Sequence, residues 1–349
     1  MLAYEYGSDG RMALREKDLP RAAEGEVTID VVAAGICGTD LKIARGEHRL
    51  FPPGTVRVPG HESVGRIREN RSGRADLEPG TPVAIAPNIA CGQCPPCRKN
   101  LGPLCEDYTS VGLTFDGGFA EVVRVTARGV AGGNVLPLPA GLDLVTAAMI
   151  EPVAAVVRGL RPLRLTPADT VLVCGAGPIG LTAVVLAKQA GVRRIIVSQT
   201  SAARRELARQ YGADETIDPR AEDLVEKVFE LTDGIGAEVV IAATPVHQVF
   251  TDAVRAAAKG GRVNFFAGLP SGKGEVTVDA NLIHYRELLV TGSTANTAAD
   301  CAEAMEIVAS APEAFAELIT HRVPLREADR AFEMAKAGEA LKVLLEPQT

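Results

Sequence analysis

The chain has 349 residues, of which 46% are hydrophobic, and a formal net charge of −7. This length suits two domains, and this hydrophobicity excludes an intrinsically disordered protein. Aromatic residues make up only 4% and Trp is absent, which together with the acidic charge argues against a nucleic-acid-binding protein. The seven Cys residues are an odd number, so a complete disulfide framework is not expected.

We expect neither a targeting signal nor a membrane span. The first residues include acids and lack an apolar signal core, and the longest apolar run, 171–187, is interrupted by Gly and Pro. The sequence therefore predicts a cytoplasmic protein without a membrane partner.

The predicted secondary-structure pattern changes near Glu151. Before it, short β-like runs alternate with Gly/Pro turns, which predicts an irregular antiparallel barrel with strands that include 27–32, 82–86 and 117–123. After it, strand and helix patterns alternate, which predicts parallel βαβ units in an α/β domain. The strands of this part are expected at 171–174, 194–198, 239–241, 262–266 and 288–291, and two of its helices at 181–190 and 202–211. Helices at 299–310 and 325–337 are expected to precede a strand at 341–345 that returns to the first domain.

A glycine loop follows the first strand of the second part. Gly175, Gly177 and Gly180 form G-x-G-x-x-G between an apolar run and a helical pattern, the context that supports dinucleotide binding. Gly175 would allow the tight turn, Gly177 would let the backbone approach a pyrophosphate, and Gly180 would let the helix pack closely. A glycine-rich turn with only a packing role is the alternative. The expected loop contacts to the cofactor come from Gly175, Gly177, Pro178, Ile179 and Gly180.

The second strand ends without the acidic residue that usually accepts the ribose hydroxyls. Gln199 stands at that place, Thr200 and Ser201 follow, and Arg204 and Arg205 come next. A carboxylate would repel a 2′-phosphate whereas Gln199 would not, so NADP is modestly favoured over NAD. The alternative is that the two Arg residues are a solvated helix face and that Gln199 serves NAD.

Four Cys residues crowd into a lobe at about 88–108. Cys91, Cys94, Cys97 and Cys105 have the spacing C-x2-C-x2-C-x7-C, which fits a closed tetrahedral zinc site. A disulfide pair, an iron–sulfur cluster and a nucleic-acid zinc ribbon are the alternatives. A site with four thiolates leaves no position for a substrate, so this zinc would be structural.

Three further donors are dispersed along the chain. Cys37 follows a predicted strand, His61 lies in a Pro-Gly-His-Glu segment, and Glu151 precedes a Pro. Cys, His and Glu donors with an open fourth position would make a catalytic zinc site. Taken singly, Cys37 is more often a small buried residue and His61 a turn residue.

Taken together, these motifs resemble the zinc-dependent medium-chain dehydrogenases/reductases of the alcohol dehydrogenase superfamily, and most closely the sorbitol/polyol and threonine dehydrogenase branch. The resemblance covers nearly the whole chain. It implies a GroES-like β-barrel catalytic domain at 1–154 and 293–349 and a doubly wound Rossmann domain at 155–292. The motifs that carry it, in the family's order, are Gly35-Ile36-Cys37-Gly38-Thr39-Asp40, Gly60-His61-Glu62, the four-cysteine lobe, Glu151-Pro152 and Gly175 to Gly180.

The resemblance also implies the ligands of a catalytic zinc. Cys37 and His61 look like direct ligands, and Glu62, Glu151 and water would share the remaining positions. Which of the two Glu residues binds directly stays open. Asp40 would accept a hydrogen bond from His61 and fix its tautomer, with turn capping as its alternative role. With the lobe, this predicts two zinc ions per chain.

By the same resemblance, Thr39 would be the first proton relay from the substrate. Several relatives continue this relay to a His where this chain has Lys42, so the proton exit stays open. The residues expected beside the nicotinamide are Ala267, Gly268, Leu269, Ser293 and Thr294.

The implied reaction is reversible hydride transfer between a secondary alcohol of the polyol, sugar or cyclitol type and NAD(P), giving the ketone. The alternatives are a threonine-type or simple alcohol dehydrogenase on the same machinery and, from another class, a noncatalytic nucleotide-binding zinc protein. The resemblance also implies a homodimer or homotetramer. Nothing in the sequence names the substrate.

Overall fold

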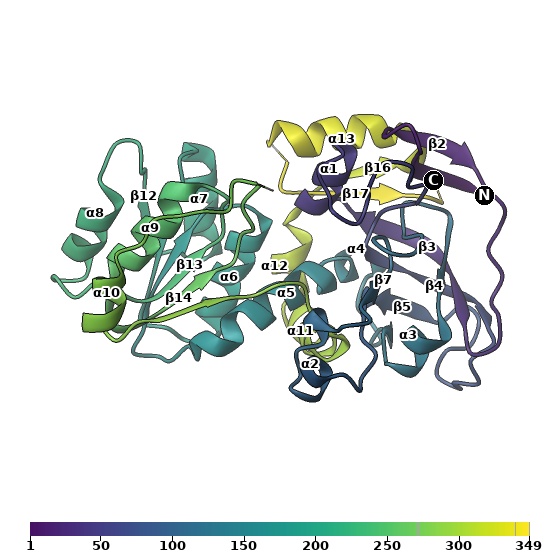
Figure 1. Cartoon of the computed structure of the whole chain (residues 1–349), viewed down its shortest axis with the longest axis horizontal. Coiled ribbons are helices and arrows are strands. Elements are labelled where there is room, and N and C mark those ends of the chain that lie inside the picture. The colour runs from purple at the N-terminus through teal and green to yellow at the C-terminus, as the bar shows by residue number, and fades with distance from the viewer. Residues whose placement is uncertain (271, 339, 349) are drawn as a thin grey trace. The chain divides into compact units, whose positions relative to one another are not determined.

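The chain forms two compact units in the computed structural model, which describes residues 1–270, 272–338 and 340–348 (Figure 1). One unit contains 1–154 and 295–349, and the other contains 155–294. The chain enters the second unit within helix α5 (Ile150–Leu160) and leaves it two residues after the expected boundary at 292.

The first unit is an irregular β-structure with short helices. Its strands are β1 (Leu2–Tyr6), β2 (Met12–Glu16), β3 (Val27–Gly35), β4 (Glu62–Asn70), β5 (Pro82–Ile85), β6 (Asn88–Ile89), β7 (Thr109–Ser110), β8 (Val122–Val125), β9 (Val135–Pro137), β16 (Ile319–Pro324) and β17 (Lys342–Glu346). Its helices are α1 (Gly38–Ala44), α2 (Pro95–Arg98), η1 (Gly102–Leu104), α3 (Ala127–Ala131), α4 (Leu144–Ala147), α11 (Ala298–Ser310), α12 (Pro312–Ala316), η3 (Leu325–Glu327) and α13 (Ala328–Ala337).

The main sheet of this unit has seven strands in the order β16-β17-β3-β4-β5-β9, with β8 also paired to β3. The alternating residues of β3 point Val27, Ile29 and Val31 into the core, where each is fully buried. Strand β17 pairs antiparallel with β3, so the C-terminal segment completes the first unit, as expected from the sequence. The GroES-like β-fold predicted for this part is confirmed.

One predicted strand is wrong at its start. The run 117–123 becomes strand only from Val122. The preceding backbone instead bonds to the turn before β4, because Gly117 N–H donates to Val58 O and Phe119 N–H donates to Pro59 O. Two consecutive glycines allow this close approach, which an extended strand with side chains would block.

The second unit is a parallel α/β sheet. Its strands are β10 (Thr170–Cys174), β11 (Arg194–Ser198), β12 (Glu215–Ile217), β13 (Ala237–Ala242), β14 (Ala257–Phe265) and β15 (Leu289–Gly292). Its helices, besides the end of α5, are η2 (Arg161–Leu163), α6 (Pro178–Gln189), α7 (Ala202–Tyr211), α8 (Leu224–Leu231), α9 (His247–Ala256) and α10 (Ala280–Tyr285).

The strand order is β12-β11-β10-β13-β14-β15, and every neighbouring pair is parallel. The order reverses beside β10, which places the crevice after β10 where ligands of such sheets bind. Strand β10 is fully buried, as its continuous apolar run indicates. The Rossmann-type fold is confirmed. None of the helices in the described ranges is long and apolar enough to cross a membrane.

Candidate functional site

The four cysteines of the lobe converge within a few ångströms. The Sγ atom of Cys97 lies 3.9 Å from that of Cys91 and 3.3 Å from that of Cys94, and the Sγ atoms of Cys94 and Cys105 are 3.8 Å apart. Backbone N–H groups also point at sulfur, since Cys91 N–H donates to Cys105 Sγ at 3.2 Å and Cys94 N–H to Cys91 Sγ at 3.4 Å.

This geometry fits a zinc ion. Four sulfurs about 2.3 Å from a tetrahedral centre stand about 3.8 Å from one another. The four thiols do not all ionise readily in the absence of a cation. Backbone N–H groups of Gln93 and Cys94 lower the pKa of Cys91 to about 6. Burial and the thiol of Cys94 raise the pKa of Cys97 to about 12. A bound cation would remove this conflict by stabilising all four thiolates.

Three dispersed donors also meet in the first unit. Cys37 Sγ and the donor atoms of His61 and Glu62 all lie within 4.8 Å of one another. The register of the sheet causes this convergence, since Gly35, at the end of β3, pairs with Glu62, at the start of β4. The two chain segments that flank this pair, one leading to Cys37 and one leaving His61, therefore emerge side by side. One thiolate, one imidazole and one carboxylate are a donor set that zinc accepts.

A buried lysine holds Glu62. Lys342, at the start of β17, donates to Oε1 of Glu62 at 2.7 Å and to Oε2 at 2.6 Å, and both side chains are almost fully buried. Burial lowers the pKa of Lys342, but the charges of Glu62 and Cys37 outweigh it and raise the pKa. Lys342 therefore supplies one positive charge beside a group of anionic donors.

Asp40 faces His61 from the first turn of α1. Its Oδ1 lies 3.6 Å from His61 Nδ1, and both atoms are buried with no hydrogen-bond partner among the described residues. Its Oδ2 accepts the Cys37 N–H at 2.8 Å in a capping box. Burial lowers the pKa of His61, but Asp40 and Cys37 outweigh it and place the pKa well above its ordinary value, so the surroundings favour positive charge.

Glu151 stands apart from this three-donor group. Its Oε1 accepts a hydrogen bond of 2.6 Å from the side-chain amide of Asn296. Burial, and then the charge of Glu62, raise the pKa of Glu151 to about 6, although the nearby His61 lowers it. The charge of Glu151 thus interacts with both neighbours, while its carboxylate is turned toward Asn296.

Thr39 and Lys42 both lie on α1. Both side chains are half-buried, and neither makes a side-chain hydrogen bond with any residue in the described part of the chain. The Thr39 hydroxyl, two residues from Cys37, is therefore available to a ligand.

The glycine loop adopts the expected turn in the second unit. Gly175 has φ +112°, a region that favours glycine. A Cβ on Gly180 would lie 1.8 Å from Gly175 O, so only glycine lets α6 begin here. Helix α6 begins at Pro178, earlier than the predicted Leu181, because Pro suits the first helical position. Ile179 and Gly180 follow in the same first turn, where backbone N–H groups without a partner inside the helix can bind an anion.

The segment after β11 is rich in arginine. Arg205 donates to the backbone oxygens of Gln199 and Thr200 at 2.7 and 2.8 Å and pairs with Asp218 at 3.0 Å. Arg220, which the sequence reading missed, pairs with the same Asp218 at 3.1 Å. Ser201 caps α7 by accepting the N–H of Arg204 at 3.4 Å, and the Arg204 side chain is half-buried rather than solvated.

The other predicted cofactor residues follow parallel strands. Ala267, Gly268 and Leu269 come shortly after β14, and Ser293 and Thr294 come directly after β15. These positions lie at the same edge of the sheet as the glycine loop, because parallel strands share one carboxyl edge.

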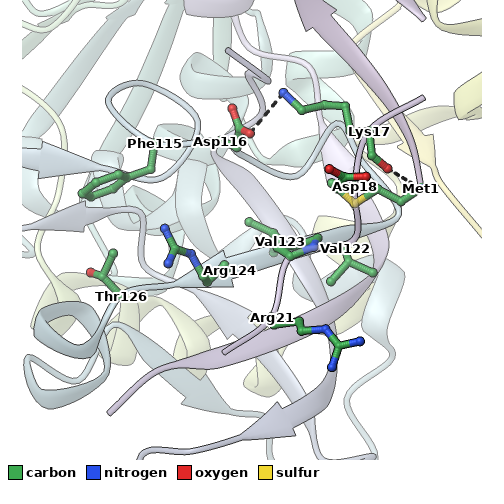
Figure 2. Close-up of a pocket in the computed structure, with 11 residues that line it drawn as sticks. Met1, Lys17, Asp18, Arg21, Phe115, Asp116, Val122, Val123, Arg124 and Thr126 are labelled. Atoms are coloured by element: carbon green, nitrogen blue, oxygen red, sulfur yellow. Dashed lines mark hydrogen bonds and ion pairs between the residues drawn. The ribbon is translucent and has the colours of Figure 1, made fainter. Parts of the chain in front are cut away.

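A cavity of about 290 Å³ lies elsewhere in the first unit (Figure 2). It is lined by residues of the N-terminal segment and β8, and Lys17 pairs there with Asp116 at 3.3 Å. None of the predicted metal or cofactor residues lines it.

Lys342 and Asn296 were also missed by sequence reasoning. They lie about 280 and 145 residues from the carboxylates they bind, and an isolated Lys in a strand or Asn before a helix carries no local signal.

Comparisons with known proteins identify the family. Residues 23–139 match the alcohol dehydrogenase GroES-like domain, and residues 178–310 match the zinc-binding dehydrogenase domain. An L-threonine 3-dehydrogenase from Thermococcus kodakarensis is 33% identical over 98% of this chain and 95% of its own length. A sorbitol dehydrogenase from Halalkalibacterium halodurans is 32% identical over 97% of this chain and 96% of its own length.

A solved structure agrees. A protein from Sinorhizobium meliloti 1021, assigned as a zinc-binding dehydrogenase and bound to NADP, superposes with a TM-score of 0.91 at 33% identity, covering 99% of both chains. The chain therefore belongs to the zinc-dependent medium-chain dehydrogenases and is an NAD(P)-linked alcohol dehydrogenase.

Proposed function

We propose that this enzyme reversibly oxidises a secondary hydroxyl of a polyol, sugar or cyclitol to the ketone. The observation that carries the proposal is the convergence of Cys37, His61 and Glu62 within 4.8 Å in a chain of this family. The substrate class is supported by a relative named for sorbitol, whereas the relative named for L-threonine represents the alternative activity.

Cys37, His61 and one of the two Glu residues would hold the catalytic zinc. When bound, zinc would polarise the substrate hydroxyl and lower its pKa, as it does for water. Glu62 belongs to the three-donor group but is held by Lys342, whereas Glu151 is held by Asn296. Each carboxylate therefore has a polar partner that could hold it while the other carboxylate binds the zinc.

The proton and the hydride leave by different routes. Thr39 would receive the hydroxyl proton as it gives up its own, and the released proton would leave through water or by way of Lys42. A bound NAD(P) would supply the hydride acceptor. Gly175 to Gly180 would hold the pyrophosphate at the start of α6, and 267–269 and 293–294 would line the nicotinamide half.

A substrate screen tests the reaction. The purified enzyme would be assayed with polyols, sugars, cyclitols, L-threonine and simple alcohols, with both cofactors and in both directions. Cofactor reduction with a polyol, sugar or cyclitol supports the proposal. A strong preference for L-threonine or for a simple alcohol would favour the alternative activity and overturn the proposed substrate class.

The enzyme would hold two zinc ions per chain and favour NADP. Metal analysis should give two zinc ions per chain, and a value of one would contradict one of the two proposed zinc sites.

Replacing Gln199 with Asp should shift the ratio of kcat/KM values toward NAD by about 10- to 100-fold, since a carboxylate repels the 2′-phosphate and accepts hydrogen bonds from the ribose hydroxyls. A wild-type preference for NAD, or an unchanged ratio, would contradict the NADP assignment.

Homodimer or homotetramer formation is supported by an edge strand. β15 lies at the end of its sheet, Leu289 on it is 48% exposed and the nearby Tyr285 is 76% exposed. An apolar edge strand favours pairing with another chain. A monomeric mass in solution would contradict this proposal.

A cytoplasmic location fits the seven unpaired Cys residues, and cell fractionation would test it.

A further inference from the structure

Glu151 is hydrogen-bonded to a pair of buried amide side chains, those of Asn296 and Asn88, which have no role in the proposed reaction. Asn296 is fully buried and Asn88 is 9% exposed. The Asn296 Nδ2 atom donates to Glu151 Oε1 at 2.6 Å and to Glu151 O at 3.2 Å. Asn88 Nδ2 donates in turn to Asn296 Oδ1 at 2.8 Å. Buried polar side chains are costly unless they are hydrogen-bonded, and these two amides meet that requirement through each other and through Glu151.

The direction of these hydrogen bonds is fixed by chemistry. An ionised carboxylate only accepts, so Asn296 must present its NH2 group to Glu151 and its oxygen to Asn88. Asn88 then has its own oxygen on the far side, where the Tyr108 hydroxyl donates to it. Asn134 also holds the Asn88 backbone oxygen at 2.9 Å. Only one orientation of each amide satisfies every partner.

The chain of amides runs from the four-cysteine lobe to the metal-site carboxylate. Asn88 opens β6, which leads to Cys91, and Tyr108 follows Cys105. β6 and β7 pair antiparallel, with Asn88 opposite Ser110, so this hairpin closes the base of the lobe. Two hydrogen bonds in series therefore connect this hairpin to Glu151.

The backbone directly before Asn296 has a left-handed conformation. Ala295, directly before it, has φ +51°, which costs energy for a residue with a Cβ. Thr297, directly after it, caps α11 through a capping box with Asp300. The chain thus accepts local strain at the position that aims the amide of Asn296.

The geometry points to Asn296 as a positioning residue for Glu151, with Asn88 linking it to the four-cysteine lobe, so that the order of the lobe sets the strength and geometry of metal binding at Cys37 and His61. This inference rests on the proposed function in one respect, namely that Glu151 serves the catalytic zinc. It adds that two metal sites, distant in sequence, are coupled through side-chain amides.

The first experiment compares wild-type and Asn296→Ala holoenzymes for zinc transfer to a chromogenic chelator. We expect one of the two ions to leave about 10- to 100-fold faster in the variant, the usual effect of removing a partner of a metal-site residue. The visible bands of the enzyme with cobalt at the catalytic site should also move. Asn264→Ala is the matched control, because Asn264 is equally buried but lies in the second unit, and it should leave zinc transfer unchanged.

Tyr108→Phe provides a milder second variant if Asn296→Ala folds poorly, because it removes only the last hydroxyl of the chain of hydrogen bonds. It should shift the cobalt bands in the same direction by a smaller amount. Unchanged zinc transfer and unchanged bands in the folded variants would overturn the positioning role.

A double-mutant comparison tests the coupling. Cys97→Ser should move the cobalt bands of the catalytic site when Asn296 is present, and should move them much less in the Asn296→Ala background. Equal shifts in both backgrounds would overturn the link. A wild-type enzyme that bound fewer than two zinc ions, or reduced no cofactor with any alcohol, would instead contradict the proposed function.

Discussion

The two candidate metal sites of the first unit are built in opposite ways. The four cysteines of the lobe lie within 15 residues of one another, in short turns around α2. Cys37 and His61 are brought together by the register of β3 and β4. Lys342 binds the carboxylate of Glu62, and Asn296 binds that of Glu151.

The difference lies in what surrounds the donors. In the lobe, the neighbours are other thiols and backbone N–H groups, so little besides a metal ion can balance four thiolates. In the dispersed site, Lys342 and Asp40 already provide charges around the donors. A metal site that only stabilises a loop needs little more than its own ligands. A metal site that performs chemistry also depends on the charged and hydrogen-bonding residues that orient those ligands.

Removing a donor of the dispersed site should have the largest effect on activity. Cys37→Ala should lower kcat/KM by at least about 10³-fold, because zinc contributes several kcal/mol of charge stabilisation in the transition state. Metal analysis should fall from two zinc ions to one. Cys174→Ala, a buried cysteine in β10, should keep both ions. Activity within tenfold of wild type would remove Cys37 from the catalytic site.

Removing the buried cation should destabilise the protein most. Lys342→Met leaves the Glu62 carboxylate buried without its partner, at a cost of about 3–5 kcal/mol in the free energy of unfolding, measured by denaturant titration. The double variant with Glu62→Gln should recover much of this loss, since it removes the stranded charge. Lys336→Met on the exposed face of α13 should change stability by less than about 0.5 kcal/mol. Similar losses in both lysine variants would mean that the Lys342 ion pair is not specially important.

Removing a donor of the lobe should separate stability from chemistry. Cys97→Ser should lose one zinc ion and about 3 kcal/mol of stability, the contribution of a ligand present at a concentration near 100 times its dissociation constant. Turnover below the melting temperature should fall less than tenfold, because the closed site offers no position to a substrate and reaches the catalytic site only through the hydrogen bonds of Asn88 and Asn296. A loss of activity as large as that of Cys37→Ala would erase the distinction between the two sites.

The smallest change concerns Asp40. Asp40→Asn keeps an oxygen that can accept the Cys37 N–H in the capping box but removes the charge opposite His61 Nδ1. Zinc dissociation should become about 10- to 100-fold faster, while the melting temperature stays nearly unchanged. If Asp40→Asn matches wild type and only Asp40→Ala is affected, capping is the sole role of Asp40.

Much of the fold followed from local patterns. The helix 202–211 was predicted with its observed bounds, because Ser201 caps it and Gly212, with φ +114°, ends it. The parallel strands followed from continuous apolar runs. The run at 117–121 failed because its hydrogen bonds go to a distant turn, and a sequence pattern does not contain that information.

The sequence by itself determined the family, the two-part architecture, the glycine loop and the lobe, since each depends on residues close together in the chain. The tertiary structure decided how the dispersed donors are used. It placed Glu62 with Cys37 and His61, paired it with a lysine, and turned Glu151 toward Asn296. Those contacts join segments up to 280 residues apart, and only the folded sheet and its packing bring such segments within hydrogen-bond distance.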